Sequence, residues 1–195
     1  MYIKLFLGLY LAILTVVTTP IPLMAQSKDA SELSAEELKT LFSKQKTRGL
    51  VLAPTNTENS ATANAENSEA QPTKPNQTYV ELAPEEQVNI QVTFDFDSSA
   101  LNDDQKPKLA TLCSVMKGVD VEVFRIVGHT DASGAAGYNK RLSLLRAQEV
   151  KRYLINDCGV EEKRLEAVGV GEEFPADKAD PRGDVNRRVE FQALS

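Results

Sequence analysis

The alternation of apolar and polar residues from Val88 to Phe96 predicts the first strand of a folded domain. Every second residue of this segment is Val, Ile or Phe, and polar residues stand between them. This period of two is typical of a strand with one buried face. A β-branched run over 121–127 predicts a central strand, and segments 165–170 and 188–194 predict two more.

Two segments between these strands have the spacing of helices, residues 106–117 and 138–157. Pro107 suits a first helical turn, and Gly118 and Gly159 follow the two expected ends. The apolar side chains of the first helix share one face: Leu109, Leu112, Cys113 and Met116. The order βαβαββ predicts an α/β two-layer sandwich, in which both helices cover one face of a small mixed sheet.

The first 78 residues divide into three segments of different composition. Residues 1–25 combine one lysine, a short apolar run and a small final residue, which is typical of a cleaved export signal; an uncleaved membrane anchor is the alternative. Residues 26–53 contain an expected short helix over 35–46, after a capping box of Ser34 and Glu37. Residues 54–78 have no Leu, Ile, Val, Met or aromatic residue, so we expect a disordered linker before the domain at 79–195.

Two cysteines, Cys113 and Cys158, follow the expected signal. Their spacing fits no zinc or redox motif, and an exported protein meets an oxidising compartment. We expect a disulfide that stabilises the fold by about 3–4 kcal/mol in the chain-entropy model. Two buried thiols in separate helices are the alternative.

Charge and composition narrow the function classes. The formal net charge is −6, with acidic and basic residues interspersed, which argues against binding of nucleic acid. One histidine and no tryptophan leave little material for a metal site or for aromatic stacking. We expect no cofactor and no bound metal.

Arg146 is the residue that fits its predicted element least well. At about 100° per residue it falls about 40° from Leu142, inside the apolar stripe that Val150, Tyr153 and Leu154 continue. Leu145 flanks this stripe on its other side. A buried arginine stays charged and needs a carboxylate. Asp131 in the preceding loop is the one nearby acid. The pair is either a structural salt bridge or a split pair that holds a ligand carboxylate on Arg146 and a ligand ammonium on Asp131.

An ordered set of motifs over about residues 88–192 resembles the C-terminal domain of the OmpA family. The set comprises Phe94-Asp95-Phe96-Asp97, Gly128-His129-Thr130-Asp131, Tyr138-Asn139, Leu142-Ser143 with Arg146-Ala147, Gly169-Val170-Gly171-Glu172 and Asn186-Arg187-Arg188-Val189-Glu190. The family includes the peptidoglycan-associated lipoprotein and the flagellar motor protein MotB. The resemblance implies the same βαβαββ sandwich.

The resemblance also implies non-covalent binding of the peptidoglycan stem peptide at diaminopimelate. Asp131 and Arg146 match the family residues that grip this amino acid, and Asn139 matches one expected to hydrogen-bond the peptide. Asp97, Thr130 and Arg187 would line the rim. The implied location is the periplasm of a Gram-negative envelope, associated with the cell wall or outer membrane.

Three other interpretations stay open from the sequence. A wall-acting enzyme would need a nucleophile with a base, a metal or opposed carboxylates, and no such group surrounds His129, so we expect no enzyme. A protein-interaction module would use the helix at 35–46 to bind an envelope protein, or that helix is an ordinary packed extension. A membrane-anchored protein would retain residues 1–25.

Overall fold

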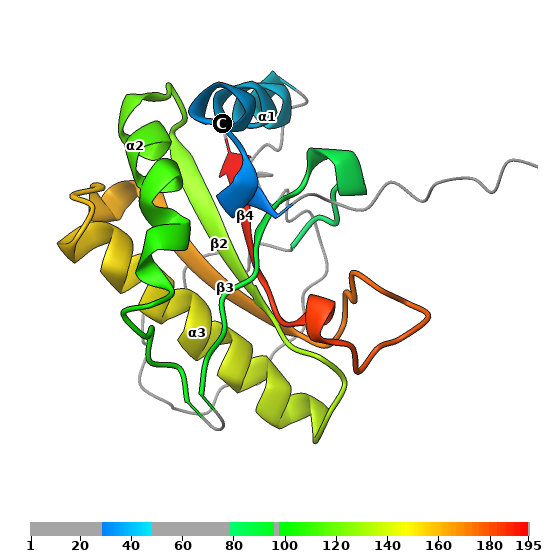
Figure 1. Ribbon diagram of the computed structural model, residues 1–195. Helices are drawn as coiled ribbons and strands as arrows, with labels where there is room; N and C mark the ends of the chain where they lie inside the picture. Colours follow the sequence, from blue (N-terminus) through cyan, green and yellow to red (C-terminus); the bar gives the residue numbers. More distant parts are fainter. Residues whose placement is uncertain (1–28, 48–78, 96–97, 195) are drawn as a thin grey trace, which may run out of the picture.

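The computed structural model of the chain describes residues 29–47, 79–95 and 98–194, which centre on a four-stranded sheet of order β1-β4-β2-β3 (Figure 1). Strand β4 runs antiparallel to both β1 and β2, and β3 runs parallel to β2. The strands are β1 (Val88–Ile90), β2 (Val123–His129), β3 (Leu165–Gly171) and β4 (Val189–Leu194). The helices are α1 (Ala35–Thr47), α2 (Ala110–Gly118) and α3 (Ala136–Asn156). The predicted βαβαββ order is therefore confirmed.

Five single turns of 3-10 helix connect these elements. They are η1 (Ala30–Glu32), η2 (Pro84–Glu86), η3 (Lys106–Leu109), η4 (Glu162–Arg164) and η5 (Asp184–Asn186). The predicted export signal and linker lie outside the described residues. Among the residues described, no helix has the length and hydropathy to cross a membrane.

Strand β1 is shorter than the sequence predicts, because its partner ends. Ile90 pairs with Val189, the first residue of β4, so the chain beyond Ile90 has no neighbouring strand. Side chains satisfy its backbone instead: Asp29 accepts from the Gln91 amide at 3.0 Å and Gln105 accepts from the Thr93 amide at 3.1 Å. The alternation identified the buried face correctly but not the length of the strand.

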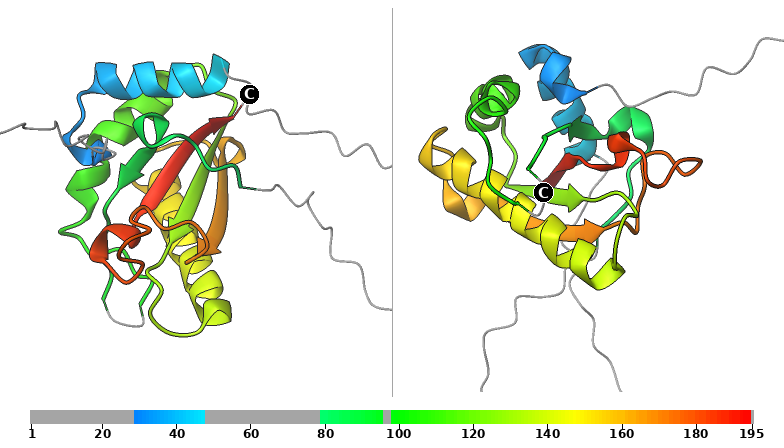
Figure 2. Two further views of the ribbon diagram at one scale, coloured as in Figure 1. Left: turned by 90° about the vertical axis from the view of Figure 1, so that its right-hand side faces the viewer. Right: turned by 60° about the horizontal axis from the view of Figure 1, so that its bottom comes forward.

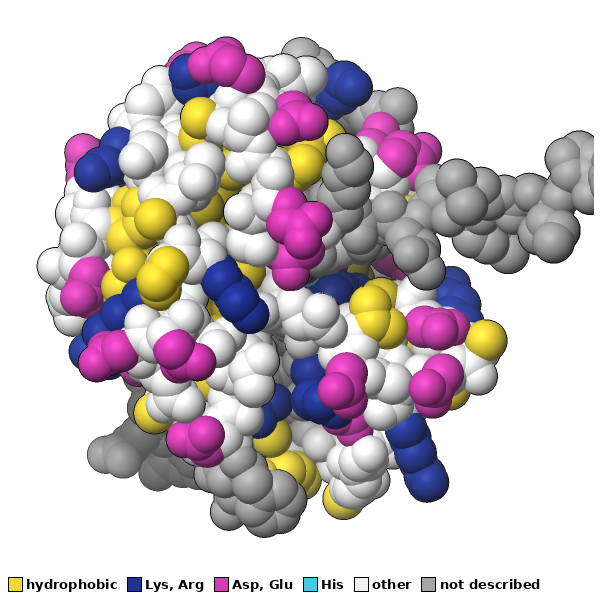
Figure 3. All heavy atoms as spheres, viewed as in Figure 1, with side chains coloured by type: hydrophobic (Ala, Val, Ile, Leu, Met, Phe, Trp, Pro, Cys, Tyr) yellow, Lys and Arg dark blue, Asp and Glu magenta, His cyan; other side chains and the backbone are white. Residues whose placement is uncertain are grey.

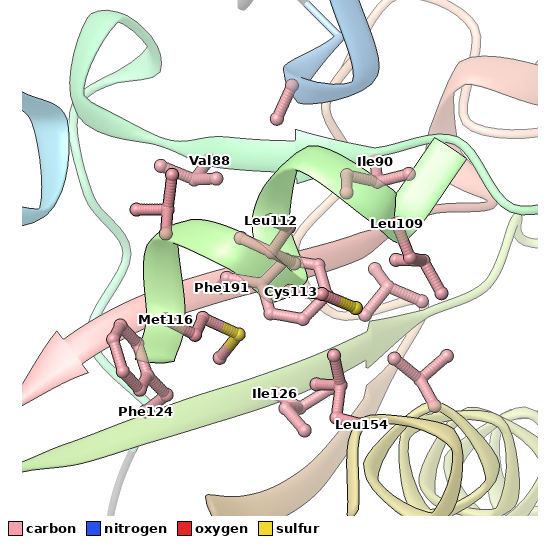
Figure 4. Close-up of a cluster of buried hydrophobic side chains, with 14 of the residues drawn as sticks. Val88, Ile90, Leu109, Leu112, Cys113, Met116, Phe124, Ile126, Leu154 and Phe191 are labelled. Carbon is pink, nitrogen blue, oxygen red and sulfur yellow. The ribbon is translucent and has the colours of Figure 1, made fainter. Parts of the chain in front are cut away.

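The main hydrophobic core lies between the sheet and the helices (Figure 4). Ile126 of β2 and Phe191 of β4 are fully buried there, facing Leu112 and Met116 of α2 and Leu154 of α3. Complete burial of each such side chain stabilises the fold by about 1.5–3 kcal/mol. The helices therefore cover one face of the sheet, as the pattern predicts.

Helix α1 belongs to this same core. Leu38 and Phe42 are fully buried, and the Phe42 ring meets Phe124 of β2 edge-on with 5.1 Å between centroids. Gln45 donates to the Glu86 carbonyl and accepts from the Ala193 amide, which joins α1 to the end of β4 (Figure 2). The apolar face of α1 is thus occupied within the chain, as expected for a packed extension.

Helix α3 packs closely on the sheet through two glycines. A Cβ atom at Gly128 would lie 2.0 Å from the Ser143 carbonyl oxygen, and one at Gly169 would lie 2.3 Å from the Leu144 amide nitrogen. Only small residues such as Ser143 and Ala147 fit beneath the helix here. The larger Leu145, predicted to flank the core stripe, is displaced outward and is 50% exposed.

The opposite face of the sheet carries buried polar groups, and we call Tyr79, His129, Arg188, Glu190 and Gln192 the polar face. Glu190 accepts hydrogen bonds from the Tyr79 hydroxyl at 2.9 Å and from Gln192 at 2.8 Å. Nε2 of His129 lies 3.3 Å from the same carboxylate. The segment that begins at Tyr79 covers this face, because Gln192 also donates to the Val80 carbonyl. His129 is the last residue of β2.

A disulfide joins Cys113 of α2 to Cys158, just beyond α3, with 5.6 Å between the two Cα atoms. This confirms the expected bridge over the alternative of two buried thiols. Because 45 positions separate the cysteines, the bond restricts the unfolded chain over a long loop. It also ties the C-terminal end of α3, far from the loop after β2, to the core.

Candidate functional site

The candidate site lies where β2 ends and α3 begins. Backbone hydrogen bonds hold the connecting loop to two other segments: Thr130 donates to the Gly171 carbonyl at 2.9 Å, and Ala132 donates to the Pro181 carbonyl at 2.9 Å. The segment after residue 97 also contacts α3, because Nε of Arg146 donates to the Ser98 carbonyl. Four stretches of the chain distant in sequence therefore meet at one end of the sheet.

Arg146 is buried at the inner edge of this site. It is 8% exposed, and its Nε donates to the Ser98 carbonyl at 3.2 Å. The guanidinium carbon lies 4.8 Å from the centroid of the Phe94 ring, a cation–π contact. Burial lowers the pKa of Arg146, but a guanidinium stays protonated in proteins. The side chain is thus fixed in place with its charge retained.

Within the described part of the chain, Arg146 forms no ion pair with a carboxylate. The acid predicted as its structural partner, Asp131, pairs instead with Arg187, whose Nη1 lies 2.9 Å from Oδ2. The predicted alternative of a structural Arg146–Asp131 salt bridge is therefore wrong. Asp131 still acts on Arg146 through space, because its negative charge raises the Arg146 pKa against the larger effect of burial.

Asp131 is nearly buried and held in one orientation. Its Oδ1 accepts from the Ser133 amide at 2.8 Å, and Oδ2 accepts from Arg187. Although burial acts to raise the pKa of Asp131, the bonds from Ser133 and Arg187 lower it below its ordinary value. Asp131 is therefore an ionised carboxylate at neutral pH. Arg187 has a second partner in Asp184 at 2.6 Å.

Asn139 holds the loop in shape from the first turns of α3. The side chain is 2% exposed, and its amide nitrogen donates to the carbonyls of Asp131 at 3.3 Å and Ser133 at 3.0 Å. The same nitrogen donates to the Glu172 carboxylate. These bonds position Asp131 through its own backbone. The direct hydrogen bond from Asn139 to a peptide stays a prediction.

The three residues predicted to line the rim, Asp97, Thr130 and Arg187, differ in where they lie. Arg187 lies beside Asp131, as described above, and is partly exposed. Thr130 is 4% exposed, and its hydroxyl has no hydrogen-bond partner among the described residues. Asp97 lies outside the described residues.

A pocket of about 150 Å³ adjoins Arg146 on the outer side of α3. Its lining comes from one helix face and one loop residue: Tyr138, Arg141, Leu142, Leu145 and Ser99. Sequence reasoning missed this pocket because it placed Leu142 and Leu145 in the core. A close approach of α3 to the sheet, signalled by Gly128 and Gly169, was the available clue.

Sequence reasoning also missed the two groups that hold Arg146. Phe94 and Ser98 precede Arg146 by about fifty positions, and no periodicity links a strand-like phenylalanine or a backbone carbonyl to a helix. The motif Phe94-Asp95-Phe96-Asp97 marked the region but not the contact.

Neither the charged residues on the face drawn in Figure 3 nor the described His, Cys, Asp and Glu residues form a second cluster like the candidate site. On the face drawn in Figure 3, acidic and basic side chains are interspersed without a broad patch of one sign. No group of three His, Cys, Asp or Glu residues with metal-binding geometry occurs in the described ranges. His129 lies 2% exposed on the polar face, where burial lowers its pKa.

The match to a family of known proteins covers the candidate site together with strands β2 and β3. The model of the OmpA family matches residues 93–188. Outer membrane porin F of Pseudomonas aeruginosa is 40% identical over 107 residues, which cover 54% of this chain and 31% of that protein. The peptidoglycan-associated lipoprotein of the same organism is 36% identical over 101 residues, covering 51% of this chain and 59% of that protein.

A solved structure is similar over about half of the chain. The peptidoglycan-associated lipoprotein from Burkholderia pseudomallei is 32% identical and is matched over 52% of this chain and 86% of its own, with a TM-score of 0.43. This chain spans about a third of the length of the porins that it matches. These relatives are outer membrane proteins and lipoproteins.

Proposed function

Since this chain belongs to the OmpA family, we propose that it binds peptidoglycan without changing it chemically and so tethers the cell envelope to the wall. The ligand is the diaminopimelate residue of a stem peptide. Its side chain ends in a carboxylate and an ammonium, which are both free when the residue is not cross-linked. The name of one relative, the peptidoglycan-associated lipoprotein of Pseudomonas aeruginosa, supports the class of ligand.

One observation carries the proposal: Arg146 is a buried cation without a carboxylate partner in the described structure. An unpaired buried charge costs several kcal/mol, whereas a bidentate carboxylate would satisfy the two terminal nitrogens of the guanidinium. The bond from Nε to Ser98 and the Phe94 ring orient those nitrogens. A ligand carboxylate therefore supplies the missing partner.

Asp131 takes the ligand ammonium in this mechanism. The carboxylate is ionised and fixed by Ser133 and Arg187. Because Arg187 also pairs with Asp184, it remains neutralised when Asp131 shares its charge with the ligand. The opposite charges of Arg146 and Asp131, held apart, match the two charges of the amino-acid end.

The same geometry predicts which peptides are rejected. A stem peptide with lysine in place of diaminopimelate lacks the terminal carboxylate and leaves Arg146 unpaired. Discrimination against an analogue that leaves a buried polar group unsatisfied reaches about 10⁴-fold in favourable sites. We expect at least a hundredfold preference here, since the site is open on one side.

The test is co-sedimentation of the full chain with purified sacculi of the diaminopimelate and lysine types. We expect wild type to bind the first and not the second, and Arg146→Met and Asp131→Asn to lose binding. Arg182→Gln is the matched control, because it removes an exposed positive charge from the same end of the molecule. Equal retention of wild type and both variants on diaminopimelate sacculi would show that the pair does not bind the wall.

A further inference from the structure

The pocket beside Arg146 combines features that the proposed grip on diaminopimelate does not use. Leu145 is 50% exposed and Tyr138 is 38% exposed, although both are large and apolar. The approach of α3 to Gly128 and Gly169 pushes this side of the helix outward. Two of the few large apolar side chains exposed in the described structure therefore line one pocket.

The pocket also contains a cation. Arg141 lines it and forms no ion pair with any described residue. By contrast, its neighbour Lys140 pairs with Glu173 at 2.9 Å, and Arg152 farther along α3 pairs with Glu149. Arg141 is thus available to an anion that enters the pocket.

The pocket lies on the same part of α3 as Arg146. Leu142 lies one helical turn before Arg146, Leu145 immediately precedes it, and Ser99 follows the residue whose carbonyl holds its Nε. Tyr138 lies near enough to Arg146 to act on its pKa in the upward direction. The main-chain end of a diaminopimelate residue whose side-chain end is held on Arg146 lies only a few bonds away, within reach of this pocket.

From this arrangement we infer that the pocket binds the D-alanine that follows diaminopimelate in a tetrapeptide stem, an inference that rests on the proposed function. The methyl group lies against Leu142 and Leu145, and the terminal carboxylate pairs with Arg141. A volume of about 150 Å³ is enough for one small residue.

A D-alanine pocket beside Arg146 would also determine which stem peptides the protein selects. Cross-linking uses either the diaminopimelate ammonium or the D-alanine carboxylate. A site that contacts both groups selects tetrapeptide stems in which neither has reacted. Wall binding then concentrates where the sacculus is least cross-linked.

The experiment compares two soluble stem tetrapeptides by calorimetric titration into the full chain. One has a free D-alanine carboxylate and the other a carboxamide at that position. We expect wild type to bind the free acid about threefold to tenfold more tightly, as for a half-exposed charge pair. Arg141→Gln should bind both peptides equally, at the affinity of wild type for the amide. Arg152→Gln, the same charge change on the same helix, should keep the preference.

The outcomes separate this inference from the proposed function. Equal binding of acid and amide by wild type, or a preference that survives in Arg141→Gln, overturns the D-alanine pocket and leaves the grip on diaminopimelate intact. Absence of binding of both peptides overturns the proposed function and the inference with it. A preference lost only in Arg141→Gln supports both.

Discussion

Two regions of this molecule bury charged groups, and they differ in the partners that surround the charge. On the polar face, Glu190 has Tyr79, Gln192 and His129 around it, all within the chain. At the end of the sheet, Arg146 has a carbonyl and an aromatic ring but no described carboxylate. Both residues are buried, Glu190 in β4 and Arg146 in α3, so burial alone does not account for the difference.

The comparison separates charges that stabilise the fold from a charge kept for a ligand. A buried carboxylate with hydrogen-bond donors around it, such as Glu190, contributes to stability, and its removal leaves those donors without an acceptor. A buried group without a counter-charge costs stability, and a ligand recovers that cost on binding. Stability and binding measurements on matched variants therefore distinguish the two regions.

The largest expected effect comes from removing the centre of the polar face. Glu190→Ala leaves the Tyr79 hydroxyl without its acceptor and Gln192 with one fewer. We expect the free energy of unfolding to fall by about 3–5 kcal/mol, measured by urea denaturation. Glu166→Ala is the control, because its partner Arg125 is buried but Glu166 itself is partly exposed; we expect about 1 kcal/mol there. Equal losses in the two variants would contradict the assignment of the polar face.

The second-largest expected effect is a difference in the free energy of unfolding between variants of two buried arginines, Arg188 and Arg146. Arg188 is 6% exposed and donates to Asn89 at 3.3 Å and to the Phe174 carbonyl at 3.2 Å. We expect Arg188→Met to lower the free energy of unfolding by about 2 kcal/mol, since hydrogen bonds from a charged group are lost. Arg146→Met should change it by less than about 1 kcal/mol, because Arg146 makes only one hydrogen bond with the described residues and Asp131 is paired with Arg187 instead. A larger loss in Arg146→Met than in Arg188→Met would mean that Arg146 is structural.

The third effect is a pH dependence that belongs to the polar face. Burial lowers the pKa of His129 below its ordinary 6.5, against the opposing influence of Glu190. The unfolded chain therefore binds the proton first, and the stability from the neutral imidazole, present above pH 6.5, is lost as the pH falls below that value. The slope is at most about 1.4 kcal/mol per pH unit.

Urea denaturation at pH 7.5 and pH 5.5 measures this loss, and His129→Gln should reduce it. The pKa of Glu190 is also lowered from 4.5, despite its burial, by His129, Gln192 and Tyr79. Its contribution is lost only at more acidic pH, below about 4.5, so the two groups separate along the pH axis. An identical pH profile in wild type and His129→Gln would exclude His129 as the source.

The pattern of residues along the sequence was enough to predict the helices and strands and the residues at the centre of the proposed site. Alternation and helical spacing predicted four strands, the helices that cover them and the helix at 35–46, because burial of one face imposes a period that is visible in any short segment. Arg146 stood out for the same reason, as a charge inside an apolar stripe. The loop before the helix supplied Asp131, and the ordered motifs added Asn139 to the same predicted site.

Contacts between segments distant in sequence determined the length of β1, the partners of the charged side chains and the exposure of Leu145. Strand β1 ends at Ile90 because β4 begins at Val189, a limit set by the partner strand and not by the alternation. Asp131 pairs with Arg187 and leaves Arg146 to Ser98 and Phe94, a choice that depends on where three loops meet. Close packing of α3 on Gly128 and Gly169 turned Leu145 from a core residue into the wall of a pocket. Periodicity reports which face of an element is buried, whereas the neighbour that covers it is set by packing in three dimensions.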